Sequence, residues 1–190
     1  MDPDRPDPTT SPWRTVSSRR VYANPWITVR EDEVVTPTGT GGIYGVVTKP
    51  LALGAVALDA DGAVVLVGQW RYPLGRYSWE LPEGAHDPGA DTTPLDGMRR
   101  ELAEETGLAA ADWTLLTTRP VALSNSVTDE EALLWLARDL VPTSVASHDP
   151  TEDLRVTRVP FDRALDAALA GRIDDALSVL GLLLADRALR

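Results

Sequence analysis

Residues 100–108 read Arg100-Glu101-Leu102-Ala103-Glu104-Glu105-Thr106-Gly107-Leu108, and this short stretch carries most of the information about the chain's architecture. It belongs to a segment in which Thr93 is suited to cap a helix, Pro94 to open its first turn and Gly107 to end it. Apolar residues follow helical spacing at Leu95, Met98 and Leu102. The segment is therefore expected to form one amphipathic helix.

Three glutamates share one face of this predicted helix. Glu101 and Glu105 are four residues apart, and Glu101 and Glu104 three apart, so their side chains are neighbours. Like charges so placed destabilise a helix, whereas hard divalent cations would turn them into oxygen ligands of a binding site. Arg100 can pair with Glu104 and hold that carboxylate in place. A solvated acidic face is the alternative interpretation.

Strands are predicted on both sides of the helix. Before it, apolar alternation and apolar runs predict strands at residues 26–35, 43–48, 51–58, 63–69 and 78–81. After it, strands are expected at 113–122, 131–137 and 154–159, and helices at 161–170 and 173–189. The Asp59-Ala60-Asp61-Gly62 turn predicts a hairpin of 51–58 with 63–69. Strands surrounded by helices, without regular alternation, predict an α/β sandwich with a mixed sheet.

The chain is expected to divide into three parts. Residues 1–20 are predicted to be a flexible tail, because the N-terminus is rich in Asp and Pro. Residues 21–49 are predicted to form a small β-strand subdomain, and residues 50–190 the main domain. Two short strands cannot bury their apolar faces alone, so the subdomain is expected to pack on another surface.

Composition narrows the classes of function. The chain has no cysteine, which excludes disulfides, thiolate metal sites and cysteine nucleophiles. A net charge of -11 argues against a nucleic-acid partner, because binding by counterion release needs a basic face. No apolar run is long enough for a membrane span, and the N-terminus has no secretory signal pattern. The cytoplasm is the expected location, with no membrane partner.

Residues 100–108 resemble the end of the Nudix signature, which reads Arg-Glu-apolar-any-Glu-Glu-any-Gly-apolar. Every specified position matches, and average composition gives such a match a chance probability of about 10⁻⁷ per window. The resemblance continues upstream through Trp79-Glu80-Leu81-Pro82-Glu83-Gly84 and Asp87-Pro88-Gly89. It implies a Nudix-type α/β/α sandwich with a mixed sheet, and it favours a metal site over a solvated face.

One part of the signature departs from the family. Its first glycine should be followed by five residues, a glutamate, and seven more residues before the arginine. Counting from Gly84 puts Ala90 at the glutamate position and leaves Arg100 two residues too far along. A two-residue insertion around Asp91–Thr93 explains the spacing, with Asp91 the nearest substitute for the glutamate. In the family this glutamate mainly supports the loop, so activity is expected to survive.

The resemblance also implies roles for particular residues. It implies that Glu101 and Glu105 bind Mg²⁺ or Mn²⁺, with Glu104 a further ligand or an orienting group. The backbone carbonyl of Glu83, before the signature glycine, would complete one metal's shell. Such cations stabilise developing charge on a diphosphate and activate the attacking water, so Glu104 and Glu105 are expected to be catalytic. His86 could contact substrate, although a lone loop histidine is more often incidental.

Three further segments resemble the ADP-ribose pyrophosphatase branch of the family. They are Gln69-Trp70-Arg71-Tyr72-Pro73, Trp79-Glu80-Leu81-Pro82 and Gly171-Arg172-Ile173-Asp174-Asp175-Ala176. The N-terminal strand pair also fits, since in that branch it is exchanged across a homodimer. A homodimer that depends on residues 22–48 is therefore expected.

Two residues are candidates for substrate binding. Arg71 could make a bidentate contact with the diphosphate, which suits a guanidinium, or it could form a surface ion pair. Trp26 could stack on a nucleotide base in the partner's site, although most tryptophans anchor cores or interfaces.

In the same branch a glutamate on a loop before a late strand can act as base. Glu130 occupies the corresponding place, and Asp129 and Glu131 are its rivals. The loop carries Ser124-Asn125-Ser126 where Ser-Pro-Gly is often found, so it is suited to a different nucleoside or sugar.

The resemblance implies a metal-dependent hydrolase that cleaves the diphosphate linkage of a nucleoside diphosphate sugar such as ADP-ribose, by water attack on phosphorus. The partner would be a small-molecule nucleotide substrate. Alternatives are a Nudix hydrolase of a dinucleotide, a coenzyme A derivative or a nucleoside triphosphate, and a non-catalytic nucleotide-sensing Nudix module. An acidic scaffold protein has little beyond net charge to support it.

Overall fold

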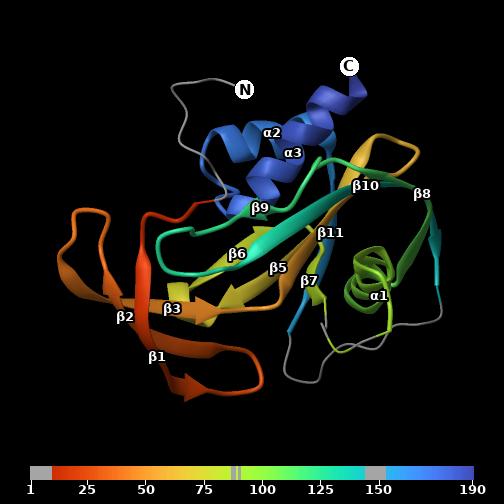
Figure 1. Ribbon diagram of the computed structural model, residues 1–190. Helices are drawn as coiled ribbons and strands as arrows, with labels where there is room; N and C mark the ends of the chain where they lie inside the picture. The colour runs from red at the N-terminus through yellow and green to blue at the C-terminus, as the bar shows by residue number, and fades with distance from the viewer. Residues whose placement is uncertain (1–9, 87–88, 90, 144–152) are drawn as a thin grey trace. The chain divides into compact units, whose positions relative to one another are not determined.

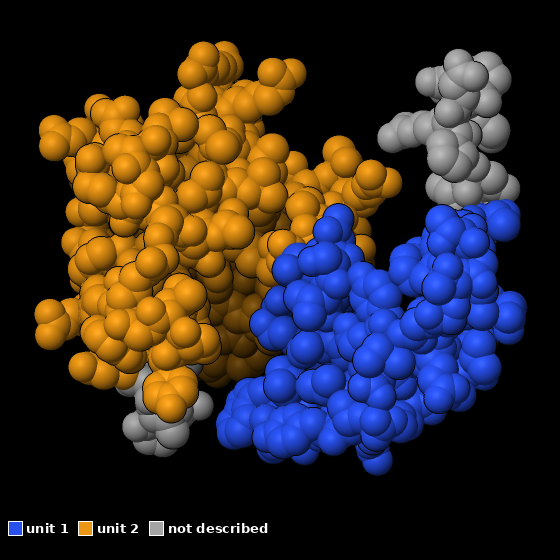
Figure 2. All heavy atoms as spheres, turned by 90° about the vertical axis from the view of Figure 1, so that its left-hand side faces the viewer, with its two compact units in different colours: residues 1–49, 124–130 blue, residues 50–123, 131–190 orange. Residues whose placement is uncertain are grey.

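The computed structural model describes residues 10–86, 89, 91–143 and 153–190 (Figure 1). The chain divides into two compact units, coloured separately in Figure 2. The first comprises Met1–Lys49 with Ser124–Glu130, and the second comprises Pro50–Leu123 with Glu131–Arg190. The short segment Ser124–Glu130 therefore belongs to the N-terminal unit, although strands of the second unit flank it in the sequence.

The first unit is a three-stranded antiparallel sheet in the order β1-β2-β3, with β1 at Arg14–Ala23, β2 at Thr28–Val35 and β3 at Gly41–Thr48. The prediction of a tail up to residue 20 was wrong at this end, because β1 starts at Arg14. Every residue of β1 is exposed, so no apolar alternation marks it. Cross-strand polar pairs line it instead, including Ser18 with Asp32 at 2.5 Å.

The segment Ser124–Glu130 is tied to β3. The Val47 amide donates to the Val127 carbonyl at 2.9 Å, and the Asp129 amide donates to the Val47 carbonyl at 3.3 Å. The Tyr44 hydroxyl donates to the Ser126 carbonyl at 2.8 Å. These bonds satisfy backbone groups that a surface loop would leave to water.

The second unit contains two sheets. One has the order β7-β4-β10-β8, with β9 paired to β10, and the other has the order β11-β5-β6. Strand β10 runs parallel to β4 and antiparallel to β8, so the predicted mixed sheet is confirmed. The strands are β4 Leu51–Ala57, β5 Ala63–Arg71, β6 Arg76–Glu80, β7 Glu83–His86, β8 Leu108–Leu115, β9 Val121–Ala122, β10 Glu131–Pro142 and β11 Arg155–Pro160.

Strands β4 and β5 are joined as predicted by a turn at residues 59–62, but they do not form a hairpin. The Gly62 amide donates to the Asp59 carbonyl at 3.1 Å, and a single bridge joins Leu58 to Val64. Beyond that point β4 pairs with β7 and β10, whereas β5 pairs with β6 and β11. Both strands are apolar on both faces, so each is buried in the middle of its own sheet.

Helices cover the strands on two sides, as Figure 1 shows, with α1 (Pro94–Thr106) on one side and α2 (Phe161–Leu169) and α3 (Ala176–Leu189) together on the other. Side chains on the two faces of β4 pack against different helix layers. In β4, Val56 packs with the cluster under α2 and α3, while Leu53 and Ala55 pack with the cluster under α1. The predicted α/β/α sandwich is therefore confirmed.

Some predicted elements differ from the structure. Strand β7 was not predicted, because its four residues lie in a Gly/Pro-rich stretch. The expected strand at 113–122 is two strands, β8 and β9, and β8 already starts at Leu108. Helix α3 starts at Ala176 rather than at residue 173, because Asp175 caps it through the Ser178 amide. No helix in the described part of the chain is long and apolar enough to cross a membrane.

Candidate functional site

Helix α1 has the termini that the sequence predicts. The Thr93 hydroxyl accepts from the Asp96 amide at 3.2 Å, and the Asp96 carboxylate accepts from the Thr93 amide at 3.1 Å, which forms a capping box. Gly107 ends the helix with a φ of 68°, a left-handed conformation that favours glycine. Met98 and Leu102 are fully buried. These contacts fix which face of α1 carries the glutamates.

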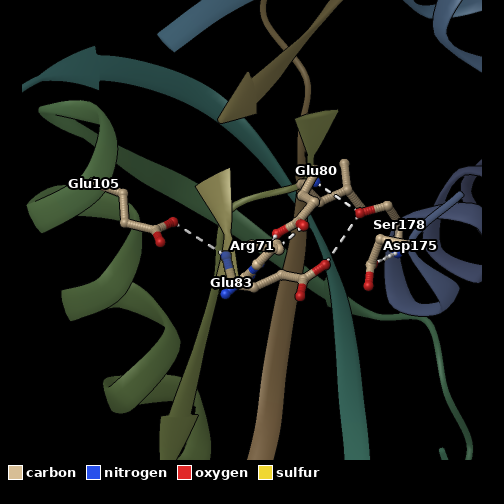
Figure 3. Close-up of polar contacts among 7 residues, drawn as sticks. Arg71, Glu80, Glu83, Glu105, Asp175 and Ser178 are labelled. Atoms are coloured by element: carbon tan, nitrogen blue, oxygen red, sulfur yellow. Dashed lines mark hydrogen bonds and ion pairs between the residues drawn. The ribbon is translucent and has the colours of Figure 1, made fainter. Parts of the chain in front are cut away.

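The glutamates of α1 contact both Arg100 and the backbone of β7. Arg100 donates to Glu101 at 2.7 Å and to Glu104 at 2.9 Å. Glu105 is only 8% exposed and accepts a hydrogen bond from the Glu83 amide at 3.1 Å (Figure 3). A buried carboxylate thus connects α1 to the first residue of β7.

Gly84 brings the backbone of β7 against Glu101. A Cβ atom at Gly84 would lie 2.1 Å from the Glu101 Cγ, so any other residue would displace that side chain. The helix glutamates and the backbone of residues 83–84 therefore lie together. This is the region where the sequence predicted a metal site.

The Glu83 side chain points away from α1, toward the start of α3 (Figure 3). Its carboxyl group accepts a hydrogen bond from the Ser178 hydroxyl at 3.1 Å. Burial, and next the charge and hydrogen bond of Asp175, raise the pKa of Glu83 well above its usual range. The side chain is therefore engaged with α3, and the backbone of Glu83 is the part that lies beside Glu105.

The donor groups suit a hard divalent cation. Glu101, Glu104, Glu105 and the Glu83 carbonyl offer only oxygen, which Mg²⁺ and Mn²⁺ prefer. Within the described residues, no three Asp, Glu, His or Cys side chains converge at metal-ligand spacing. In this arrangement Arg100 occupies oxygens of Glu101 and Glu104. The residues fit such a cation in chemistry and neighbourhood, and binding it would exchange ion pairs for metal ligands.

Arg71 forms an ion pair with Glu80. Its Nε donates to the two Glu80 carboxylate oxygens at 2.9 and 3.0 Å, and its Nη2 makes a further short contact. The Glu80 side chain is 3% exposed and that of Arg71 38%. The hydrogen bonds to Glu80 raise the pKa of Arg71. An ion pair was the alternative interpretation of Arg71, and a contact between Arg71 and substrate stays a prediction.

We expect Arg71→Ala to lower the free energy of unfolding by about 2 kcal/mol, or the Tm by about 6 °C. The change leaves the buried Glu80 carboxylate without its charged partner, and the partial exposure of Arg71 reduces the loss below that of a fully buried pair. Thermal unfolding measures it. Arg76→Ala is the matched control, because Arg76 pairs with Asp174 on the surface and should shift Tm by far less. Equal shifts for the two variants would contradict the prediction.

The candidate bases lie in two units. Glu130 belongs to the N-terminal unit and pairs with Lys49. Asp129 accepts from the Thr48 hydroxyl at 2.8 Å and from the Lys49 amide at 3.3 Å, so its oxygens are already used in holding the segment. Glu131 is exposed on the second unit, where it lines a groove. Glu130 differs from Asp129 in that the described contacts of its carboxylate are limited to the ion pair with Lys49, while its amide is bonded to the Thr128 hydroxyl.

The remaining predicted positions are less constrained. Trp26 is 74% exposed in the N-terminal unit, and its stacking on a nucleotide base stays a prediction. His86 is partly buried at the end of β7, near Gly97 of α1. Of the unusual loop, Asp87, Pro88 and Ala90 lie outside the described residues.

Sequence reasoning assigned no role at the site to Asp175 or Ser178. A local signal existed for Asp175, because it lies within the segment 171–176 singled out above, at the N-cap position three residues before Ser178. The link from Ser178 to Glu83, 95 residues away, had no local signal.

Known proteins resemble this chain over most of its length. The NUDIX domain model matches residues 48–178, and a model described as the nucleoside diphosphate sugar hydrolase N-terminal domain matches residues 13–47. The ADP-ribose pyrophosphatase of Mycobacterium tuberculosis is 30% identical over 177 residues, which are 90% of this chain and 82% of that protein. The ADP-ribose pyrophosphatase of Bacillus subtilis is 28% identical, over 86% of each chain.

A solved structure confirms the fold independently. It is described as an ADP compounds hydrolase, superposes with a TM-score of 0.80 at 23% identity, and covers 93% of this chain and 94% of its own. The match includes the N-terminal region as well as the α/β/α sandwich. The predicted family is therefore confirmed: the chain belongs to the Nudix hydrolases, in the ADP-ribose pyrophosphatase-like branch of that family.

Proposed function

We propose that the protein hydrolyses the diphosphate linkage of a nucleoside diphosphate sugar such as ADP-ribose, by attack of water on phosphorus. The observation that carries this proposal is the buried Glu105 carboxylate, bound to the Glu83 amide beside the contact of Gly84 with Glu101. Two relatives named ADP-ribose pyrophosphatase support the substrate class. The lack of cysteine fits an enzyme of the cytoplasm.

Glu101, Glu104 and Glu105 and the backbone carbonyl of Glu83 would hold Mg²⁺ or Mn²⁺. When bound, such cations neutralise charge on the diphosphate and lower the pKa of the attacking water. Arg100 keeps Glu101 and Glu104 on one face of α1 before the cation binds. The Glu83 amide donates to one oxygen of Glu105 at 3.1 Å and so holds this carboxylate beside the backbone of β7.

Glu130 is our candidate for the base that takes a proton from the attacking water. Its amide donates to the Thr128 hydroxyl at 3.0 Å, and its carboxylate pairs with Lys49. The first contact holds the backbone and the second restrains the side chain, and a base requires such positioning. Arg71 and Trp26 are the candidates for contacts with the diphosphate and the base of the substrate.

The function is tested with a panel of ADP-ribose, other nucleoside diphosphate sugars, dinucleotides, coenzyme A and nucleoside triphosphates. Cleavage of a diphosphate sugar yields two phosphomonoesters, which an added phosphatase converts to inorganic phosphate. We expect the highest kcat/KM for a nucleoside diphosphate sugar, and transfer of ¹⁸O from labelled water to a phosphomonoester. Binding without turnover of any panel member would favour the sensing module instead.

We also propose that the protein is a homodimer held by its N-terminal unit. The N-terminal unit leaves large apolar side chains exposed, among them Trp13, Val16, Tyr22, Trp26 and Ile43. Monomeric proteins seldom expose this many large apolar side chains on one small unit. An isologous interface would bury these side chains on both subunits.

Ile43→Lys is expected to convert the dimer to a monomer, because Ile43 is 70% exposed at the apolar surface of β3. A buried charge at an isologous interface appears twice and lacks a partner both times. Light scattering at micromolar concentration measures the mass. Thr40→Lys, in the exposed turn before β3, adds the same charge and should leave the mass unchanged. A monomeric mass for the unmodified chain would contradict the dimer.

A further inference from the structure

The start of α3 is joined to the segment that precedes Gly84. Ser178 lies in the first turn of α3 and is completely buried. Its hydroxyl accepts from the Leu81 amide at 2.9 Å and donates to the Glu83 carboxyl group at 3.1 Å (Figure 3). One hydroxyl therefore bonds to two residues that flank Pro82, using its donor and its acceptor.

Close packing holds α3 at the same place. A Cβ atom at Gly181 would lie 2.6 Å from the Leu81 Cδ1, so any other residue there would have to displace the end of the Leu81 side chain. On the other side of Ser178, Leu177 reaches within 3.1 Å of the equivalent position at Gly54 in β4. Asp175 caps the helix by accepting from the Ser178 amide at 2.8 Å. The packing and the cap of α3 therefore hold the Ser178 hydroxyl in a fixed position.

Glu83 is consequently held from two directions. Helix α3 bonds to its side chain through Ser178, and helix α1 bonds to its amide through Glu105 at 3.1 Å. In Figure 3 these two contacts lie on opposite sides of the residue. The two contacts restrict movement of the Glu83 backbone, and the carbonyl of Glu83 is the proposed metal ligand.

We propose that Ser178 is a positioning residue for the metal site, which acts by holding the Leu81–Gly84 backbone so that the Glu83 carbonyl faces the glutamates of α1. The proposal rests on the proposed function for the identity of the site. It goes beyond that function by assigning a role to the last helix, which carries none of the predicted metal ligands. Mutation of a residue that is hydrogen-bonded to a metal-binding residue typically lowers metal affinity or activity by about 10-fold to 100-fold.

The test is a titration of the full-length protein with Mn²⁺ in the absence of substrate, followed by electron paramagnetic resonance of the free ion. We expect Ser178→Ala to raise the dissociation constant of Mn²⁺ by about tenfold. Ser178→Thr keeps the hydroxyl and should restore most of the affinity. The magnesium concentration that gives half-maximal hydrolysis should rise in Ser178→Ala by a similar factor.

Ala185→Gly is the matched control, because Ala185 is also fully buried on α3 and the glycine weakens the helix without removing a hydrogen bond to the loop. It should lower Tm and leave Mn²⁺ affinity unchanged. Unchanged affinity in Ser178→Ala, or equal loss in both variants, would overturn the proposal and leave the proposed function standing. Weakened Mn²⁺ binding in Ser178→Ala alone would support it even in a protein that hydrolyses no member of the substrate panel.

Discussion

Glu105→Gln is expected to lower kcat by about 10³-fold to 10⁴-fold while the protein stays folded. The change removes one negative charge from the proposed metal site, and metal stabilisation of a phosphoryl transition state amounts to several kcal/mol. The glutamine carbonyl can still accept from the Glu83 amide, as the Glu105 carboxylate does at 3.1 Å. The loss of activity should therefore come from the chemical step and not from displacement of the Glu83 backbone.

Steady-state kinetics at saturating Mg²⁺, with thermal unfolding of the same samples, measures this effect. Glu130→Gln is the comparison, with an expected loss of about 10²-fold, since a general base typically contributes that much or more. Near-normal turnover of Glu105→Gln at saturating Mg²⁺ would show that the assignment of ligands on α1 is wrong. A larger loss in Glu130→Gln than in Glu105→Gln would reverse the proposed roles.

Removing divalent cations with a chelator is expected to abolish hydrolysis, and adding Mg²⁺ or Mn²⁺ to restore it. The candidate ligands are all oxygens, and a chain without cysteine and with two histidines is poorly suited to zinc. In addition, the diphosphate and the protein, with its net charge of -11, repel each other unless cations lie between them. Full turnover in metal-free buffer would refute the mechanism.

A second measurement separates binding from catalysis. A cation that binds only the folded state raises the free energy of unfolding in proportion to the logarithm of its concentration over the dissociation constant. Mn²⁺ should therefore raise Tm of the unmodified protein and raise that of Glu105→Gln much less. Thr40→Lys, far from any proposed ligand in the sequence, should respond to Mn²⁺ like the unmodified protein.

The properties of α1 could be predicted from the sequence because they are local. Thr93, Pro94 and Gly107 act on the backbone within one turn of their own positions, and the spacing of Glu101, Glu104 and Glu105 follows from helix geometry alone. The sandwich was predictable for a similar reason, since apolar strands and amphipathic helices must bury their apolar faces against each other. The family followed from the same nine residues.

Only the tertiary structure decided which distant residues meet. In the folded chain β4 and β5 belong to different sheets, and Ser124–Glu130 forms hydrogen bonds with β3. Arg71 pairs with Glu80, and Ser178 donates a hydrogen bond to Glu83. None of these contacts could be predicted from periodicity, because the sequence around a polar residue does not identify a partner that lies tens of residues away. The helix that carries the candidate metal ligands was thus determined by local rules. The contacts of Glu83 with Ser178 and of Arg71 with Glu80 were determined by long-range packing and hydrogen bonds.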